Sequence, residues 1–190
     1  LRRLVARADV FLHNMRLAAI DRLGFGPAEM CALNPRLIYC SAIGFGSRGP
    51  YAARPAYDDV IQAASGIAGL PVHIGGEPAY VPGVIADKIA ALYAANAIAM
   101  ALYGRRDSGR GVEIEVPMFE VLSAFVMTEN LAAHHFSVPP APRSQRPLNR
   151  PPRPLHTTDC LLALLTHTRA PWQRTTTATP PHHVVPPPPF

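Results

Sequence analysis

The stretch Leu37-Ile38-Tyr39-Cys40-Ser41-Ala42-Ile43 decides the fold class of this chain. It is nearly all apolar, is rich in residues that favour β-structure, and shows no alternation of polar and apolar positions. A strand with two apolar faces is covered on both of them, as in the parallel sheets of α/β proteins. We therefore predict a buried strand over residues 37–43, within a parallel sheet.

The residues before this stretch alternate between strand and helix patterns. Val10-Phe11-Leu12 is a short apolar run and predicts another buried strand. Residues 17–23 and 28–33 predict two short helices with glycines between them, and Pro27 suits the first turn of the second helix. This order of strand, helix and strand favours an α/β fold over an all-α fold.

The residues after the stretch continue the same alternation. The longest apolar run, Ile89–Tyr103, has 15 residues and includes Asn96, whereas a membrane span needs about 20, so we expect a buried helix there. The predicted elements are a helix from Tyr57 to Ser65, a glycine- and proline-rich loop over 66–83, a long helix from about Val84 to Arg106, an alternating strand over 112–116, and a helix from Pro117 to about His134.

The charges and prolines divide the chain into two parts. The net charge of +5 suggests a polyanionic partner, but residues 1–138 hold twelve basic and twelve acidic residues. Residues 139–190 hold six arginines against Asp159 alone, together with 14 of the 22 prolines. We predict a globular segment over 1–138 and an irregular, Pro/Arg-rich tail over 139–190, with no nucleic-acid partner.

Cysteine and histidine usage argues against a metal site. The three cysteines are far apart, no CxxC pair occurs, and the histidine pairs are adjacent rather than four residues apart. Arginines and Asp9 interrupt the early apolar residues, so no secretory signal is predicted. We expect a cytoplasmic protein with no metal and no membrane partner, and the first residue, Leu1, suggests a fragment or a processed chain.

Asp87 is the sharpest catalytic candidate. It is predicted in the first turn of the long helix, where the helix dipole favours a charged carboxylate. Its apolar neighbours would disfavour the charge by desolvation, and a poorly solvated carboxylate is a good nucleophile toward an acyl carbon. The alternative is an acidic residue that stabilises the helix and faces water.

Two loops that follow predicted strands could bind a ligand. The glycine-rich residues 43–50 follow the strand over 37–43, and open α/β sheets bind ligands at the carboxyl ends of their strands. Asn14 and Arg16 follow the first strand, where an arginine could meet a phosphate. The alternatives are an ordinary turn and a solvated loop, because the glycine spacing matches neither a Rossmann nor a P-loop motif.

Together these segments resemble the family III CoA-transferases, the CaiB/BaiF-like group that contains formyl-CoA transferase, carnitine CoA-transferase and α-methylacyl-CoA racemase. The resemblance covers about residues 1–138, and a weaker echo follows over 153–174. The segments that carry it are ADVFLHNMR (8–16), DRLGFG (21–26), LNPRLIYCSAIGFGSRGPYAARPAYDDVIQAASG (33–66), VPGVIADKIAALYAANAIAMALYGRRDSGRGVEIEVPMFEVL (81–122) and TENLAAHHF (128–136).

The resemblance implies a reaction and a set of site residues. Asp87 matches the family's catalytic aspartate, which attacks an acyl-CoA, forms a mixed anhydride and then an aspartyl-CoA thioester, and passes CoA to an acceptor carboxylate. Acyl-CoA and a carboxylic acid are then the substrates, and no permanently bound cofactor is expected. The residues implied to contact CoA or the acyl group are Asn14, Arg16, Gly44, Phe45, Gly46, Arg54 and Tyr57.

Position 57 separates two reaction classes within the resemblance. Racemases of the family have a histidine 30 residues before the aspartate, and here that residue is Tyr57. An ordinary phenol, with a pKa of about 10, is a poor base for an α-proton. The sequence therefore favours a transferase. An α-methylacyl-CoA racemase-type isomerase and a non-enzymatic interaction chain that uses the basic tail remain as alternatives.

The resemblance also implies that this chain is part of a larger protein. Relatives begin with a further strand and helix, continue through a second domain, and act as dimers of two interlocked chains. We therefore expect the middle of a Rossmann-like large domain, little or no activity of the isolated chain, and a homodimer in the full-length protein.

Overall fold

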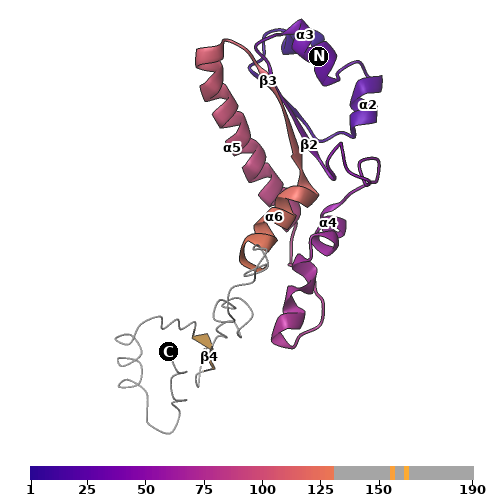
Figure 1. Cartoon of the computed structure of the whole chain (residues 1–190), viewed down its shortest axis with the longest axis vertical. Coiled ribbons are helices and arrows are strands. Elements are labelled where there is room, and N and C mark those ends of the chain that lie inside the picture. The colour runs from indigo at the N-terminus through magenta and orange to yellow at the C-terminus, as the bar shows by residue number, and fades with distance from the viewer. Residues whose placement is uncertain (131–154, 157–160, 163–190) are drawn as a thin grey trace, which may run out of the picture. The chain divides into compact units, whose positions relative to one another are not determined.

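The computed structural model describes residues 1–130, 155–156 and 161–162. The chain divides into two units, Leu1–Leu148 and Asn149–Phe190. In the first unit, a three-stranded parallel sheet is flanked by helices (Figure 1). The predicted α/β class is therefore confirmed as a mixed α/β fold with a small parallel sheet.

The strand predicted over residues 37–43 is present in this parallel sheet, and it is the central strand. The strands are β1 (Val10–His13), β2 (Ile38–Ile43) and β3 (Val112–Pro117), in the order β1-β2-β3. Ile38 is the register partner of both Val10 and Val112. The first three residues of β2 are completely buried, which agrees with a strand that is covered on both faces.

The two faces of the sheet carry different helices. Because successive side chains of a strand point to opposite faces, Tyr39 and Cys40 enter separate cores. Tyr39 packs with Val5 and Met30, which belong to α1 (Arg2–Val5) and α3 (Pro27–Leu33). Cys40 packs with alanines of α5 (Ile85–Ser108). Figure 1 shows α3 and α5 on opposite sides of the strands.

Helix α5 begins and ends within two residues of its predicted bounds. Its last residue is followed by Gly109, which has a φ of 67° and ends the helix in the left-handed conformation that glycine adopts readily. Ala86, Ala90 and Ala94 are buried, so small side chains allow a close approach to the sheet. The prediction of a buried helix is confirmed for this face.

The opposite face of α5 differs from the prediction of a buried helix. Leu92, Met100 and Tyr103 are each 70% exposed or more. By length and apolar composition alone, α5 meets the requirement for a helix that crosses a membrane, a requirement that core helices also meet. A local sequence pattern identifies apolar residues but not what covers them, so the burial of this face could not be read from it.

The remaining helices follow the carboxyl ends of the strands. Helix α2 (Leu17–Arg22) follows β1, α4 (Asp58–Ala64) follows the loop after β2, and α6 (Met118–Asn130) follows β3. A 3₁₀-helix, η1 (Ile67–Ile74), occupies part of the predicted loop over 66–83. Short 3₁₀ turns have no hydrophobic period, so the sequence pattern did not reveal η1. Ile61, Ile89 and Leu122 join α4, α5 and α6 in one core.

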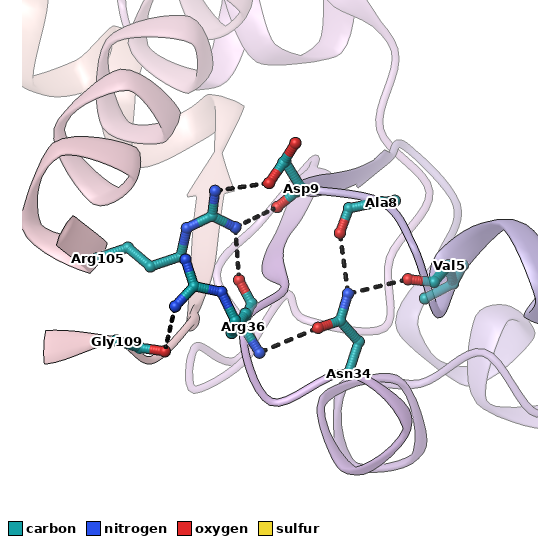
Figure 2. A network of polar contacts seen from close by, with 7 residues as sticks. All are labelled: Val5, Ala8, Asp9, Asn34, Arg36, Arg105 and Gly109. Carbon is teal, nitrogen blue, oxygen red and sulfur yellow. Dashed lines mark hydrogen bonds and ion pairs between the residues drawn. The ribbon is translucent and has the colours of Figure 1, made fainter.

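A network of hydrogen bonds and one ion pair connects the segments that precede the strands (Figure 2). The Arg105 guanidinium donates to the Asp9 carboxylate at 2.7 Å and to the Arg36 carbonyl oxygen at 2.7 Å. The Arg36 guanidinium donates to the Gly109 carbonyl oxygen at 3.0 Å. The far end of α5 is thereby tied to the loops before β1 and β2, which limits movement of the helix along the sheet.

Asn34 occupies the other half of this network, and its replacement gives a test of the fold. Its Nδ2 donates to the carbonyl oxygens of Val5 and Ala8 at 3.0 and 2.9 Å, and its Oδ1 accepts from the Arg36 N–H at 3.1 Å. We expect Asn34→Leu to lower the free energy of unfolding by about 1–3 kcal/mol, because partly buried backbone groups lose their partners. Urea unfolding of the intact protein measures this.

Asn34→Asp is the matched control, because it keeps the oxygen that accepts from Arg36 but loses both donations. We expect it to be about as destabilising as Asn34→Leu. A change below about 0.5 kcal/mol in both variants, the size typical of ordinary surface substitutions, would contradict a stabilising role for the network.

In the second unit, the structure describes two short strands. β4 (Leu155–His156) and β5 (Leu161–Leu162) pair antiparallel, with Leu155 opposite Leu162. The rest of the predicted tail lies outside the described residues. Its irregular character and the domain boundary at residue 138 therefore stay predictions.

Candidate active site

A cavity of about 970 Å³ opens at the carboxyl ends of β1 and β2, beside the first turns of α5. Its lining comes from the loop after β1, the loop after β2 and the segment before α4, together with the alanine-rich face of α5. Seven of the eight residues predicted for the site line it. They are Asn14, Arg16, Gly44, Phe45, Arg54, Tyr57 and Asp87.

Gly46 is the predicted residue that the structure does not bring to this cavity. Its N–H donates to Glu120 Oε1 at 2.9 Å, and the N–H of the next residue, Ser47, donates to Glu115 Oε1 at 2.8 Å. A Cβ at position 46 would lie 2.6 Å from that Glu120 oxygen. The two backbone N–H groups that a phosphate would need therefore already donate to carboxylates of the protein. The loop is fixed by these hydrogen bonds and is not open to a ligand.

Gly44 allows two walls of the cavity to meet. A Cβ at this position would lie 2.1 Å from the Cβ of Ala56, in the segment before α4. The Gly44 carbonyl oxygen accepts from the Phe119 N–H at 3.0 Å, so the backbone here is also fixed by α6. Any side chain at position 44 would force these segments apart.

An aromatic stack places Arg54 at the cavity wall. The Phe45 ring, which is buried, has its centroid 5.6 Å from that of Phe119 and 5.5 Å from that of Tyr51. The Arg54 guanidinium carbon lies 4.6 Å from the Tyr51 ring centroid, within cation–π range. The cation is thereby oriented without a carboxylate partner among the described residues, and it keeps its hydrogen-bond donors available.

Tyr57 stands at the start of α4, directly before the helix. Its backbone is extended and its side chain is 73% exposed, yet it lines the cavity. Within the part of the chain that the structure describes, its phenol makes no hydrogen bond. The phenol is therefore free to meet a molecule bound in the cavity.

Asp87 lies in the first turn of α5, as predicted, and its side chain is exposed to the cavity. Partial burial raises the pKa of its carboxyl, and the negative charge of Asp58 raises this pKa further. The predicted direction of the desolvation effect is confirmed, whereas the contribution of Asp58 was not foreseen. The alternative of a water-facing helix residue describes its exposure but not its place in the cavity wall.

Asp58 and Gln62 form a buried pair beneath Asp87. Only 7% of Asp58 and none of Gln62 is exposed. Asp58 Oδ1 accepts from the Asp87 N–H at 3.0 Å, and its Oδ2 accepts from Gln62 Nε2 at 2.6 Å. Because Val84, which precedes α5, provides no side-chain cap, Asp58 caps the helix from α4.

Gln62 extends this arrangement to the segment before α5. Its Oε1 accepts from the Val81 N–H at 2.8 Å, and its Nε2 also lies 3.3 Å from the carbonyl oxygens of Val81 and Gly83. Neither residue of the pair was predicted from the sequence as part of the site. The available signal was an acidic and an amide residue four positions apart, on the same face of a predicted helix.

The described residues contain no group of three or more histidine, cysteine, aspartate or glutamate side chains that could hold a metal ion. Cys31 and Cys40 are free, and burial raises the pKa of both thiols, so they are poor nucleophiles. The carboxylate of Asp87 is therefore the group of this cavity that best fits nucleophilic chemistry.

Comparisons with known proteins point in one direction. Residues 1–186 match the sequence profile of CoA-transferase family III, which extends past residue 138. The chain is 43% identical over 124 residues to acetyl-CoA:oxalate CoA-transferase of Acetobacter aceti, a match that covers 65% of this chain and 32% of that protein. It is 35% identical over 130 residues to succinate–glutarate CoA-transferase of Agrobacterium fabrum, which covers 68% and 32%.

Solved structures agree with the sequence comparisons. A CaiB/BaiF family protein from Brucella suis superposes with a TM-score of 0.64 and 40% identity, covering 67% of this chain and 34% of that one. The structure of Rv3272 from Mycobacterium tuberculosis gives a TM-score of 0.74 at 28% identity, covering 93% and 46%. This chain spans about a third of the length of the two curated relatives named above.

Proposed function

The chain belongs to CoA-transferase family III, and from this premise we propose that it carries the nucleophile and part of the CoA site of an acyl-CoA:carboxylate CoA-transferase. Asp87 is the nucleophile, and the reaction passes through covalent aspartyl intermediates. An acyl-CoA and a carboxylic acid are the substrates, and no permanently bound cofactor takes part.

The proposed reaction balances without an added oxidant or base. Asp87 attacks the thioester carbonyl carbon, the C–S bond breaks, and CoA leaves as a thiolate, which gives an aspartyl–acyl anhydride. The thiolate then attacks the aspartyl carbonyl, which releases the donor acid and leaves an aspartyl-CoA thioester. The acceptor carboxylate repeats the two steps in reverse, so acceptor acyl-CoA departs and Asp87 is regenerated.

One observation carries this proposal. Asp87 shares a single cavity with Arg16 and Arg54, so a nucleophile and two cations line the same space. Arginine suits the phosphates of CoA and the carboxylate of an acceptor, because its planar group donates to two oxygens at once. The volume of about 970 Å³ is within the range of small-molecule sites.

The racemase-type alternative finds less support. The residue that would serve as its second acid or base is Tyr57, whose phenol is exposed and makes no hydrogen bond among the described residues that would activate it. The third alternative, an interaction chain that uses the basic tail, depends on residues outside the described part of the chain. It stays a prediction.

An isotope-exchange experiment tests the proposal. Acetyl-CoA or succinyl-CoA is incubated with the intact protein and with carbon-14-labelled oxalate, succinate or glutarate, the acids named in the two curated relatives. We expect label to enter the CoA thioester pool. Deuterium incorporation at the α-carbon of a 2-methylacyl-CoA, without any acid and without label exchange, would replace the proposal with the isomerase.

The exposed face of α5 supports a larger assembly. We propose that the full-length protein completes a Rossmann-like large domain around this sheet and forms a homodimer in the cytoplasm. Leu92, Met100 and Tyr103 then pack against parts that lie beyond this chain. Because the cavity is also built from only about a third of a relative's length, the isolated chain is expected to have little activity.

A further inference from the structure

His13, the last residue of β1, joins a buried polar pair to the loop that carries Arg16. Its Nδ1 accepts from the Met15 N–H at 3.2 Å. On the other side of the ring, Nε2 lies 3.0 Å from Tyr39 Oη and 3.0 Å from Ser41 Oγ, both on β2. No motif of the sequence singled out this histidine, and the reaction proposed above does not use it.

The hydrogen bonds fix the protonation state of this ring. The Tyr39 hydroxyl donates its one proton to the Phe25 carbonyl oxygen at 2.8 Å, so its oxygen must accept from His13. The proton of the imidazole is therefore on Nε2. Nδ1 is the unprotonated nitrogen, as its contact with the Met15 N–H requires. The ring is neutral, and both nitrogens are used.

The loop that His13 holds is one wall of the candidate site. Residues 13–17 line the cavity without interruption. At its far end, the loop is held by the Arg16 carbonyl oxygen, which accepts from the N–H groups of Ala19 and Ile20 in α2 at 2.9 and 3.1 Å. The near end of the loop is therefore held at Met15, by the hydrogen bond from its N–H to the His13 ring.

We propose that His13 is a positioning residue: its neutral ring holds residues 14–16 in the shape that presents Arg16 to the phosphates of an acyl-CoA. The proposal rests on the transferase function proposed above, through the identity of the ligand. It assigns His13 no role in the chemical step, so substrate binding should depend on it and turnover should not.

The charged and titratable groups around the ring influence the pH at which it gains a second proton. Asp21 of α2 and Tyr39 of β2 face the ring, and Arg16 lies in the loop itself. Burial is the largest effect and lowers the pKa of His13, while the Met15 backbone contact and the charge of Asp21 act in the opposite direction. When the ring does gain its second proton, Nδ1–H and the Met15 N–H become two donors in contact, and the loop is released.

Two amide substitutions test the roles of the two ring nitrogens separately. In His13→Asn the side-chain oxygen can accept from the N–H two residues ahead, as in an Asx-turn, so the loop contact is kept. In His13→Gln the longer amide can reach Tyr39 and Ser41, but no acceptor remains for Met15. We expect His13→Gln to raise the KM for acyl-CoA and the Kd for CoA about tenfold, with kcat within about twofold of the original. His13→Asn should leave both constants near their original values.

A truncated substrate and the pH dependence give independent readouts. Acyl-pantetheine lacks the phosphates of CoA, so its KM should be the same in His13→Gln and the unmodified protein. As the pH falls below the ordinary imidazole pKa of about 6.5 and reaches the lowered pKa of His13, the Kd for CoA, measured by calorimetry, should rise more steeply in the unmodified protein than in His13→Asn. The phosphates of CoA titrate equally in both measurements, so the difference reports the ring.

The control variant is Tyr39→Phe, which removes a buried contact of His13 and leaves Met15 fastened. It should lower the midpoint of thermal unfolding without changing the Kd for CoA. An equal rise in Kd for Tyr39→Phe and His13→Gln, or an unchanged Kd in His13→Gln, would overturn the positioning role. If the unmodified protein binds CoA but exchanges no label, the transferase proposal fails separately, and the calorimetric comparison still decides the role of His13.

Discussion

Replacing Asp87 by asparagine is expected to abolish CoA exchange, with a fall in rate of at least about 10³-fold. Asparagine has nearly the shape of aspartate, and the backbone N–H that donates to Asp58 is unchanged, so the first turn of α5 should be preserved. The amide is uncharged and cannot attack the thioester. The initial rate of label exchange in the intact protein measures the loss.

The same substitution should not destabilise the protein at neutral pH. Because the pKa of Asp87 is raised in the folded state, folding favours its uncharged form. The stabilisation from this group is complete below its unfolded pKa, near 3.8, and is lost as the pH rises through the raised value. At neutral pH the charged carboxylate therefore lowers the stability of the fold, and asparagine removes this charge. The thermal unfolding midpoint of Asp87→Asn should be equal to or above that of the unmodified protein.

Asp59→Asn is the matched control for Asp87→Asn. Asp59 is an exposed neighbour on α4 and does not line the cavity, so its amide variant should exchange label at the original rate. Mass spectrometry must verify that the asparagine introduced by Asp87→Asn has not deamidated, since traces of aspartate would restore activity. Full exchange by a variant that retains this asparagine would remove Asp87 from the mechanism.

The elements of this fold were predictable because their signals are local. The apolar run over 37–43 predicts a buried strand without any other information. Gly109 marks the end of the long helix in the sequence. The predicted site was also largely brought together, because loops after parallel strands meet at one edge of a sheet. Asn14 and Gly44, 30 positions apart, reached one cavity in this way.

The polar contacts were not predictable, because their partners are distant in sequence and have no periodic pattern. His13 meets residues 26 and 28 positions away, and Asp58 caps a helix 29 positions away. The same limit explains Gly46. A glycine loop after a strand favours a ligand site, but only the structure reveals that Glu115 and Glu120, from β3 and α6, already occupy its amides.

The second large effect is expected from Asp58→Ala, because one buried carboxylate both caps α5 and pairs with Gln62. The variant removes a helix cap and the shortest contact of a fully buried amide, so we expect a loss of about 2–4 kcal/mol in the free energy of unfolding. Asp87 then sits on a loosened first turn. The rate of exchange should fall by about 10–100-fold, since small displacements of a reacting group have effects of this size.

Asp58→Asn separates the charge of Asp58 from its hydrogen bonds. The asparagine oxygen can still accept from the Asp87 N–H, so the cap survives, although its amide then opposes the donor of Gln62. Without the negative charge, the pKa of Asp87 should fall toward its ordinary value, and burial alone should keep it raised. Exchange depends on ionised Asp87, so the acid limb of the rate profile should move to lower pH in both variants, while only Asp58→Ala loses the cap. An acid limb that stays in place would show that Asp58 acts on Asp87 through geometry alone, because the repulsion between the two carboxylates would then contribute nothing to the titration.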